Sequence, residues 1–567
     1  MLTELKAKVG TALQGAGHDS KALLPLLEAP KRPGQGHLAL PIFALAKSQG
    51  QPPPLFAANL AKTLNDKNTD MDLAKVEAIQ GFVNFHFTPR FVQNILMKAV
   101  HGAAPLGSSV RGQGKTMVID FSSPNVAKPM HVGHLRATVI GQAIVNLAQS
   151  QGYKVVGLNH LGDWGVQFGN LAWAYQNWGK EYPFDEKPFE SLYQLYVRFH
   201  QAAETDSALA KVGAETFRRL EDGDPQITKI WRMVVDISLK EYARLWKMLG
   251  VKHDLVRGES FYNDRLKGVE QLLEKKGLLV ESDGAMVVRL DDEGMAPCLI
   301  RKTDGASLYA TRDLASAIYR HDELRADLNL YVVGAEQTLH FRQVFSVLKR
   351  LGYNWADGCH HISFGMYRFK DIGKMSSRSG NVIFLEDVLS KAVDMVREVI
   401  AQKNPDLPNR DLIAEQVGVG AVIFNDLMND RVKNVEFDWA KILDFEGDSG
   451  PYVQYCYVRC NSVIKKAGRT TAHAMSAELT SLEEQELIRH LLNFPHVVAT
   501  AFDHFKPHVV ATYLLDICRL FGQFYTKHRI LGEPEDVLNS RLALVEAVQK
   551  TIRRGLEILN IQAPEAM

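Results

Sequence analysis

The sequence has few cysteines and no long apolar run, and both absences restrict where this protein can act. Its cysteines are scattered and odd in number, which is atypical of a disulfide framework: Cys298, Cys359, Cys456, Cys460 and Cys518. The first ten residues lack the apolar core of a secretory signal, and no stretch of about eighteen apolar residues is present. We therefore expect a cytoplasmic protein with reduced thiols and no membrane span.

The chain also lacks an excess of one charge, since 66 Lys and Arg residues face 65 Asp and Glu residues. A strongly basic protein would indicate a polyanionic partner for the whole surface, so a nucleic-acid surface must here be local. Up to residue 115, thirteen basic residues stand against seven acidic ones. The N-terminal part is therefore the expected electrostatic footprint.

A chain of 567 residues, 46% of them hydrophobic, is too long for a single core. Residues 102–109, followed by Gly112 and Gly114, have linker chemistry and end a mixed helix and strand pattern. From about residue 410 the pattern is almost entirely helical. We expect three domains, an α/β N-terminal appendage, an α/β catalytic domain and an all-α domain, over residues 1–110, 111–445 and 446–567.

Strand and helix patterns alternate after the linker and predict a parallel sheet. Residues 116–121 form a short apolar run, 133–150 are helical, and 154–160 are typical of the next strand. Such a unit joins parallel strands by a right-handed crossover. Apolar runs at 328–334 and 361–364 suggest the other half of the sheet. Because the residues in between are largely helical, we expect a nucleotide-binding fold that is split by an insertion.

The first chemical motif, His131-Val132-Gly133-His134, lies between a predicted strand and the start of a helix. The amino end of a helix attracts anions, and Gly133 removes a side chain that would keep a nucleotide from the backbone. His131 and His134, three residues apart, can both donate hydrogen bonds to phosphate oxygens as charge builds. Two histidines around a glycine are more often an ordinary turn, but the strand, loop and helix setting favours phosphate binding.

The second motif, Lys374-Met375-Ser376-Ser377, lies in a loop of small residues about 240 positions downstream. A lysine on a flexible stem suits a leaving pyrophosphate. Alone, the loop is more simply interpreted as a solvated segment. Its pairing with the histidine motif favours phosphate chemistry.

The two motifs, in this order, resemble the signatures of class I aminoacyl-tRNA synthetases. Longer strings resemble the arginyl-tRNA synthetase family along essentially the whole chain: residues 81–85, 125–136, 159–169, 308–315, 450–455 and 561–567. The resemblance implies a Rossmann-like catalytic domain split by an insertion. It also implies an N-terminal appendage that binds the outer corner of tRNA, a helical anticodon-binding domain and a monomer.

The resemblance implies that L-arginine, ATP and tRNA(Arg) are the substrates. The arginine carboxylate would attack the α-phosphorus of ATP, and a terminal ribose hydroxyl of tRNA would then accept the arginyl group. A carboxylate is already ionised, so the first step needs positioning and charge stabilisation but no general base. Mg²⁺ would accompany ATP. No structural zinc is expected, because the pairs Cys456 with Cys460 and His504 with His508 lack a second pair.

The resemblance also implies the site residues. The catalytic residues would be His131, His134 and Lys374. The ATP site would add Lys128, Gly133, His160, Gln167, Met375, Ser376 and Ser377. The arginine site would comprise Ser123, Asn125, Glu259, Tyr309, Asp313 and Gln337. Carboxylates suit a guanidinium because they accept its paired donors.

Several alternatives stay open at these positions. Tyr309 and Asp313 are four residues apart and would share a helix face, whereas the match around Glu259 is short and its alignment could slip. His160 could equally be an ordinary buried histidine. Either Lys128 or Lys374 could dominate at the phosphates. Three tyrosines of the helical domain could stack on tRNA bases or could be core residues: Tyr452, Tyr455 and Tyr457.

Two other functions share some of these sequence features. A small-molecule adenylyltransferase can share the histidine motif, but it seldom needs a helical tail like the one expected here. A synthetase-like RNA-binding protein with a decayed site would not be expected to keep His131, His134, Tyr309, Asp313 and Lys374.

Overall fold

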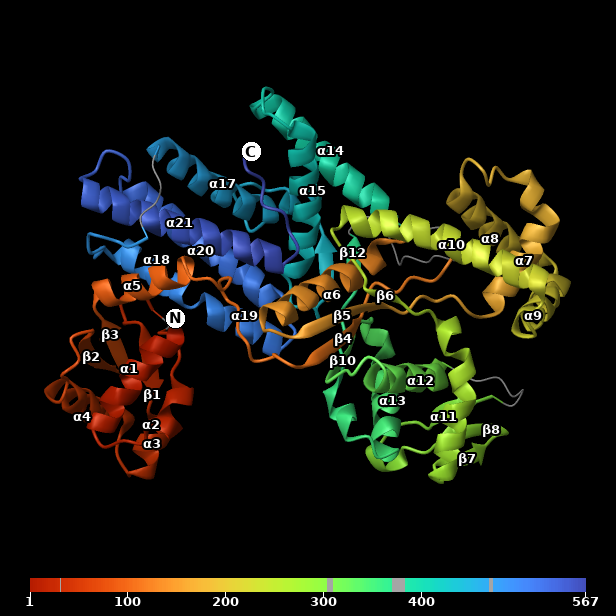
Figure 1. Ribbon diagram of the computed structural model, residues 1–567, viewed down its shortest axis with the longest axis horizontal. Coiled ribbons are helices and arrows are strands. Elements are labelled where there is room, and N and C mark those ends of the chain that lie inside the picture. Colours follow the sequence, from red (N-terminus) through yellow and green to blue (C-terminus); the bar gives the residue numbers. More distant parts are fainter. Residues whose placement is uncertain (31, 303–308, 370–382, 469–472) are drawn as a thin grey trace.

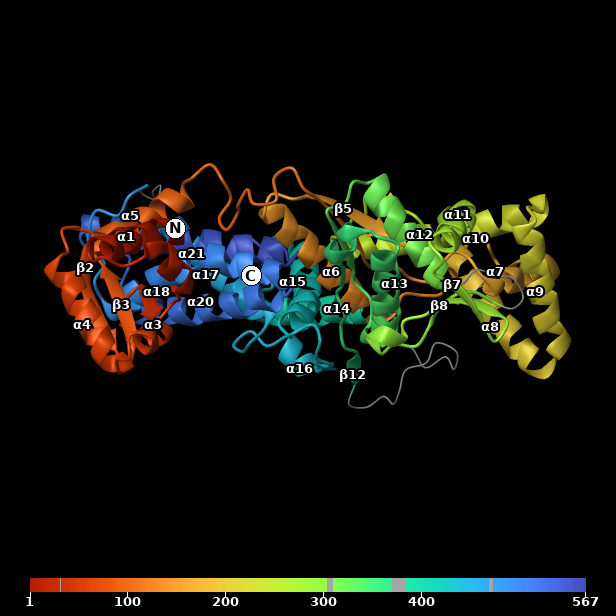
Figure 2. The same ribbon diagram turned by 90° about the horizontal axis from the view of Figure 1, so that it is seen from below.

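The computed structural model describes residues 1–30, 32–302, 309–369, 383–468 and 473–567. Its main bodies follow one another along the long axis (Figure 1), with the N-terminal body at one end and the helices inserted into the catalytic domain at the other. The view from below shows the same order (Figure 2). In the described part of the chain, no helix is both long and apolar enough to cross a membrane.

The N-terminal body is a small antiparallel sheet covered by helices. Its strands are ordered β1 (Leu38–Pro41), β3 (Phe82–Phe87) and β2 (Leu73–Ile79). The main helices are α1 (Leu2–Gly15), α4 (Pro53–Asp66) and α5 (Pro89–Val100). Gln80 and Gly81 join β2 to β3 with positive φ angles of 48° and 87°, as a tight hairpin turn requires. The mixed helix and strand pattern expected before the linker is therefore confirmed.

A five-stranded parallel sheet forms the centre of the molecule. The strand order is β11 (Cys359–His361), β10 (Leu328–Tyr331), β4 (Thr116–Asp120), β5 (Lys154–Asn159) and β6 (Leu255–Val256). Helix α6 (Val132–Ser150) connects β4 to β5, as the sequence predicted. The last expected strand begins two residues earlier than its apolar run and ends at His361.

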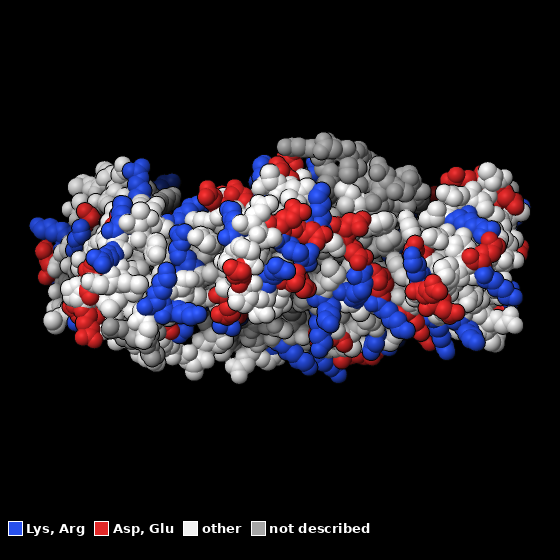
Figure 3. Space-filling view, turned by 90° about the horizontal axis from the view of Figure 1, so that it is seen from above, with Lys and Arg blue, Asp and Glu red and all other residues white. Residues whose placement is uncertain are grey.

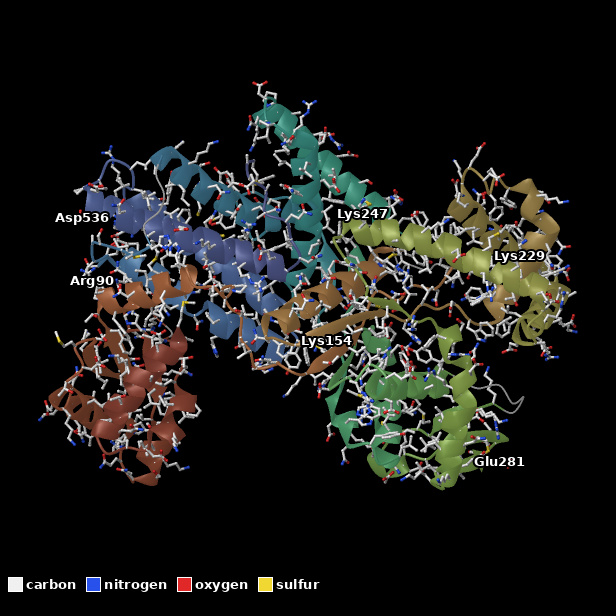
Figure 4. The ribbon with its side chains drawn as sticks, viewed as in Figure 1. Arg90, Lys154, Lys229, Lys247, Glu281 and Asp536 are labelled. Carbon is white, nitrogen blue, oxygen red and sulfur yellow. The ribbon has the colours of Figure 1, made fainter. Side chains whose placement is uncertain are left out.

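Four helices are inserted between β5 and β6: α7 (Val166–Trp178), α8 (Pro188–Thr205), α9 (Ser207–Glu221) and α10 (Pro225–Met248). Lys229 and Lys247 mark the length of α10 in Figure 4. Helix α11 (Asn263–Lys275) follows β6, and α12 (Tyr309–Asp322) and α13 (Thr338–Arg350) flank β10. The split of the nucleotide-binding fold is therefore confirmed.

The region before β10 is less helical than expected, because it contains a second sheet. The strands β7 (Leu279–Ser282), β8 (Ala285–Val288) and β9 (Cys298–Arg301) pair antiparallel. Asp283 and Gly284 make the β7 to β8 turn with φ angles of 51° and 76°. An Asp-Gly pair favours a two-residue hairpin turn, and it is the sequence signal that the expectation of a largely helical region did not include.

The C-terminal part is a helical bundle. Its main helices are α14 (Leu385–Lys403), α15 (Arg410–Leu427), α17 (Gly450–Ala467), α18 (Leu482–Leu492), α19 (Phe494–Asp503), α20 (His508–Lys527) and α21 (Glu535–Ile558). Within the region expected to be helical, α18 and α19 are separate helices that meet at Asn493, because Pro495 cannot donate the backbone hydrogen bond of a continuous helix. One short strand, β13 (Val435–Phe437), lies inside the region expected to be helical. It pairs in parallel with β12 (Tyr367–Phe369), which precedes that region.

Polar contacts fix the bodies to one another. Arg90 of α5, labelled in Figure 4, donates to the carbonyl oxygens of Met475 and Ser476 in the helical domain. Asn146 of α6 donates to the carbonyl oxygens of Glu557 and Ile558, at 3.0 and 3.2 Å. Helix α6 is thus tied near its carboxyl end to the last turn of α21.

A buried ion pair anchors the other end of α6. The guanidinium of Arg136 lies 3.1 Å from Asp426 of α15, and it also donates to the carbonyl oxygens of Gly365 and Lys433. Arg136 and Asp426 are each only 1% exposed. Because a broken buried pair leaves an uncompensated charge, this contact fixes the amino half of α6 against α15.

Candidate functional site

The loop between β4 and α6 is held by the insertion helix α10. Tyr242 donates to the carbonyl oxygens of both Asn125 and Lys128, each at 2.7 Å, and Ser238 accepts from the backbone N–H of Ala127 at 3.0 Å. Ala127 and Ser122 have φ angles of 65° and 55°, which are costly for residues other than glycine. Helix α10 therefore compensates for a strained backbone beside the predicted ATP site.

The two motif histidines cap α6 reciprocally. His131 Nδ1 accepts from the N–H of Gly133 at 3.0 Å, and His134 Nδ1 accepts from the N–H of His131 at 3.1 Å. This pattern assigns the proton of each neutral ring to Nε2. Burial and then the charge of Lys128 lower the pKa of His131, and burial and then His131 lower the pKa of His134 to about 3. Both rings are therefore neutral donors near pH 7.

Gly133 has a second structural role beside the one expected from the sequence. A β-carbon at this position would lie 2.7 Å from Cε1 and 2.8 Å from Nδ1 of His131. The absent side chain makes room for the imidazole that caps the helix.

The chain returns to the histidine motif just after the lysine loop. His131 pairs with Phe384 in an antiparallel bridge, Val132 donates to the carbonyl oxygen of Ile383 at 3.2 Å, and Leu385 donates to Met130 at 3.0 Å. Lys374, Met375, Ser376 and Ser377 themselves lie outside the described residues. The Nζ of Lys128 lies 5.1 Å from the centre of the Tyr196 ring. Because Lys374 cannot be compared with it, the relative roles of Lys128 and Lys374 at the phosphates stay a prediction.

Ser123 belongs to a hydrogen-bonded chain at the end of β4. Its hydroxyl donates to Asp120 at 2.8 Å and accepts from the N–H of His160 at 3.0 Å. Asp120 also receives a bond of 2.8 Å from Arg320, and both side chains are buried. Burial alone would raise the pKa of Asp120, but the Arg320 charge lowers it below its usual range.

Asn125 and His160 both face this edge of the sheet. Asn125 is exposed, and a β-carbon on Gly162 would lie 2.2 Å from its side-chain oxygen. His160 is half-buried, with its ring 5.5 Å from Tyr262 and its Nδ1 unbonded among the described residues. Gln167 is half-buried in the first turn of α7. A buried nitrogen without a partner favours a ligand role for His160 over a purely structural one.

An acidic cluster lies just beyond β6. Burial raises the pKa of Glu259 to about 7; the Arg312 charge opposes this shift, while Asp163 and Asp313 add to it. Asp163 is itself buried, and its carboxylate accepts from the N–H and the hydroxyl of Ser260, at 2.8 and 2.6 Å. Three carboxylates thus gather where the sequence predicted two. Asp163 was missed, although it stands in a string that carried the family resemblance.

Two of the residues predicted for the arginine site lie on α12, and the expected shared helix is confirmed. Asp313 forms a contact of 2.6 Å with His340 Nε2 of α13. Tyr309 lies one turn earlier on the same helix and is 67% exposed, so it is not a core residue. Gln337 is exposed just beyond β10. Within the described chain, the side chains of Tyr309 and Gln337 form no hydrogen bond with Glu259 or Asp313.

The C-terminal helical bundle contains a cavity of about 550 Å³, lined by residues of α14 and α15 on one side and of α17 and α20 on the other. Tyr452, Tyr455 and Arg459 lie on its wall. Tyr457 is 1% exposed and belongs to the core, so it is not available to stack on a base. Among the described residues, no group of three or more His, Cys, Asp or Glu could hold a metal ion.

Three family models together match almost the whole chain. The N-terminal domain of arginyl-tRNA synthetase matches residues 3–87, the catalytic domain of class I tRNA synthetases (R) matches 92–439, and the DALR anticodon-binding domain matches 453–567.

Curated relatives and solved structures agree with these matches. An arginine–tRNA ligase of Clostridium beijerinckii is 43% identical over 96% of this chain and 97% of its own, and one of Exiguobacterium is 44% identical over 96% and 95%. The Thermus thermophilus arginyl-tRNA synthetase has a TM-score of 0.85 at 25% identity, covering 100% of both chains. The Plasmodium falciparum enzyme shares the fold, with a TM-score of 0.81 at 22% identity. The chain therefore belongs to the arginyl-tRNA synthetases, class I enzymes that use ATP to join arginine to tRNA.

Proposed function

We propose that arginine binds between the acidic cluster and the β4 loop, with its guanidinium at Glu259 and Asp313. The observation that supports this most directly is the gathering of Glu259, Asp163 and Asp313, with Arg312 as the one charge among the described residues that lowers the pKa of Glu259, because this cluster needs a further countercharge before Glu259 loses its proton. An arriving guanidinium supplies that countercharge and ionises Glu259. Ser123 and Asn125 hold the α-amino and carboxylate end, and Tyr309 and Gln337 complete the pocket.

ATP lies along the α6 amino end, with its adenosine toward His160 and Gln167. The arginine carboxylate attacks the α-phosphorus, and pyrophosphate leaves. His131 and His134 donate from Nε2 to phosphate oxygens that gain charge in this step, as neutral donors already oriented by their Nδ1 bonds. Gly133, Met375, Ser376 and Ser377 border the nucleotide. Lys128 and Lys374 neutralise the phosphates, and Mg²⁺ arrives with ATP.

The tRNA(Arg) spans the molecule as a partner of a monomeric, cytoplasmic enzyme. The N-terminal body, residues 1–110, contacts the outer corner of tRNA, and the helical domain, residues 446–567, binds the anticodon. The cavity bordered by Tyr452, Tyr455 and Arg459 offers aromatic and cationic groups suited to an unstacked base. The catalytic domain, residues 111–445, receives the acceptor end. Basic and acidic residues are mixed over the face in Figure 3, so this contact relies on local groups.

Pyrophosphate exchange into ATP tests the arginine site. We expect exchange only with arginine present, and only when tRNA is supplied. Asp313→Ala raises the KM for arginine far more than the KM for ATP, because it removes an acceptor of the guanidinium. Asp322→Asn is the matched control, since Asp322 is also on α12 and also contacts a histidine, His321, at 2.7 Å. Equal losses for arginine and ATP in Asp313→Ala would assign that residue a structural role only.

A further inference from the structure

His340, the third residue of α13, contacts a residue of the proposed arginine site. Its Nε2 lies 2.6 Å from Oδ2 of Asp313, which stands on the neighbouring helix α12. Both side chains are half-buried, with 23% and 19% of their surfaces exposed. Gln337, another residue proposed for that site, stands three positions earlier at the N-cap of α13. The start of α13 therefore carries a histidine that has no part in the proposed reaction but touches the proposed site.

Both partners of this contact are fixed by their surroundings. Phe341, next to His340, is buried, and its ring centre lies 5.0 Å from that of Tyr331 in β10. Helix α12 is tied to β9 by Thr311, whose buried hydroxyl donates to the carbonyl oxygen of Ile300 at 2.6 Å. Helices α12 and α13 lie side by side (Figure 1) and share one hydrophobic core. The imidazole and the carboxylate thus meet on rigid elements, which suits a positioning role.

The hydrogen bond to His340 orients the Asp313 carboxylate without using up its capacity to accept. An ionised carboxylate only accepts, so His340 donates from Nε2 and occupies one lone pair of Oδ2. The other oxygen, Oδ1, can then accept from a ligand. A guanidinium is a planar fork of paired donors, so it needs the carboxylate in one plane, whereas a compact ammonium charge does not. A fixed Asp313 carboxylate therefore favours arginine.

We propose that His340 is a positioning residue for arginine recognition, an inference that rests on the proposed arginine site. The Nε2–H group of His340 holds the plane of the Asp313 carboxylate so that Oδ1 meets the guanidinium. His340 itself touches neither the ligand nor the reacting atoms. Its loss should therefore weaken arginine binding without changing ATP binding or the chemical step.

Two substitutions of similar size separate the hydrogen bond from the shape of the side chain. His340→Leu removes the donor, whereas His340→Gln places an amide nitrogen the same number of bonds from the backbone. In pyrophosphate exchange with tRNA present, we expect His340→Leu to raise the KM for arginine about tenfold, with kcat and the KM for ATP within about twofold of wild type. His340→Gln should restore most of the loss. An unchanged arginine KM in His340→Leu, an equal rise for ATP, or equal losses in both variants would overturn the proposal.

His321→Leu is the matched control. His321 also lies on α12, is also half-buried, and also contacts an aspartate, Asp322, at 2.7 Å. This variant should leave the KM for arginine unchanged. If calorimetry shows that His340→Leu does not fold, His340→Asn takes its place, because its shorter amide keeps a polar group but cannot reach Oδ2 of Asp313. The same tenfold rise is then expected, and an unchanged KM would again overturn the proposal.

A double substitution shows whether His340 acts through Asp313. In an Asp313→Ala background, His340→Leu should raise the KM for arginine by less than about twofold. A further tenfold rise in that background would show that His340 acts by another route, and the proposal would be wrong. The same cycle separates the two inferences. If Asp313→Ala alone leaves the arginine KM unchanged, the proposed arginine site itself fails; if it raises the KM and His340→Leu does not, only the positioning role fails.

Discussion

Two buried acidic sites lie at the same edge of the parallel sheet, and they differ in the source of their countercharge. At the end of β4, Asp120 is paired with Arg320 from α12. Beyond β6, the charges of Asp163 and Asp313 add to the effect of burial on Glu259, and the Arg312 charge opposes it. The first carboxylate has a lowered pKa and the second a raised one.

If arginine binds at the Glu259 cluster as proposed, one sheet edge serves both folding and binding. A carboxylate that is paired within the chain contributes to the framework, because separating the pair would leave a buried charge. A cluster of three carboxyl groups opposed by one arginine charge keeps Glu259 protonated at a higher pH, so a further cation would be needed to ionise it. Arginine and Arg320 present the same guanidinium group, so under the proposed binding mode both carboxylate sites would recognise the same group.

Removal of Arg320 tests the internal pair and should have the largest effect. Arg320→Met leaves Asp120 buried without a countercharge, and we expect a loss of about 3–5 kcal/mol of stability in the catalytic domain. Scanning calorimetry measures the shift in the corresponding transition. Asp120→Asn combined with Arg320→Met should recover a large part of this loss. Unchanged stability in Arg320→Met would mean that the pair does not hold the framework.

Glu259→Gln tests the unpaired cluster. It keeps the shape of the side chain but removes the charge that meets the guanidinium. We expect the KM for arginine to rise about 100-fold, from a loss of roughly 3 kcal/mol, with little change in the KM for ATP or in stability. Exchange kinetics measure both constants. Glu274→Gln is the control, because Glu274 is an exposed residue of α11. A normal arginine KM in Glu259→Gln would remove this residue from the arginine site.

Asp163→Asn produces the smallest change, in the pH dependence of arginine binding. Glu259 must be ionised to bind a cation, so affinity rises as the pH increases through about 7. The Asp163 charge contributes to the raised pKa of Glu259, and Asp163→Asn therefore moves the midpoint to lower pH. Ser260→Ala loosens the same loop without changing its charge, so it should leave the midpoint in place. Calorimetric titration with arginine from pH 5.5 to 8.5 distinguishes the two effects.

Much of this arrangement could be predicted from local sequence patterns. The strands around β4 and β5, helix α6 and the position of the histidine motif follow from apolar periodicity and helix-end chemistry. The pairing of Asp120 with Arg320, 200 residues away, depends on tertiary contact, and the local pattern around Asp163 gives no indication of its two bonds to Ser260. The pairing of β12 with β13 could not be predicted from sequence periodicity, because each strand has only three residues.

Helix α6 fixes the rotation and the distance of the histidine motif relative to the helices α15 and α21. Its amino end carries the two histidines, Arg136 locks its first turns to α15, and Asn146 meets the end of α21. Each residue added to a helix turns everything beyond it by about 100° and advances it by about 1.5 Å. A single insertion between Arg136 and Asn146 would therefore point one of the two anchors away from its partner. The length of the segment between Arg136 and Asn146 is therefore constrained as strongly as the identity of its two anchoring side chains.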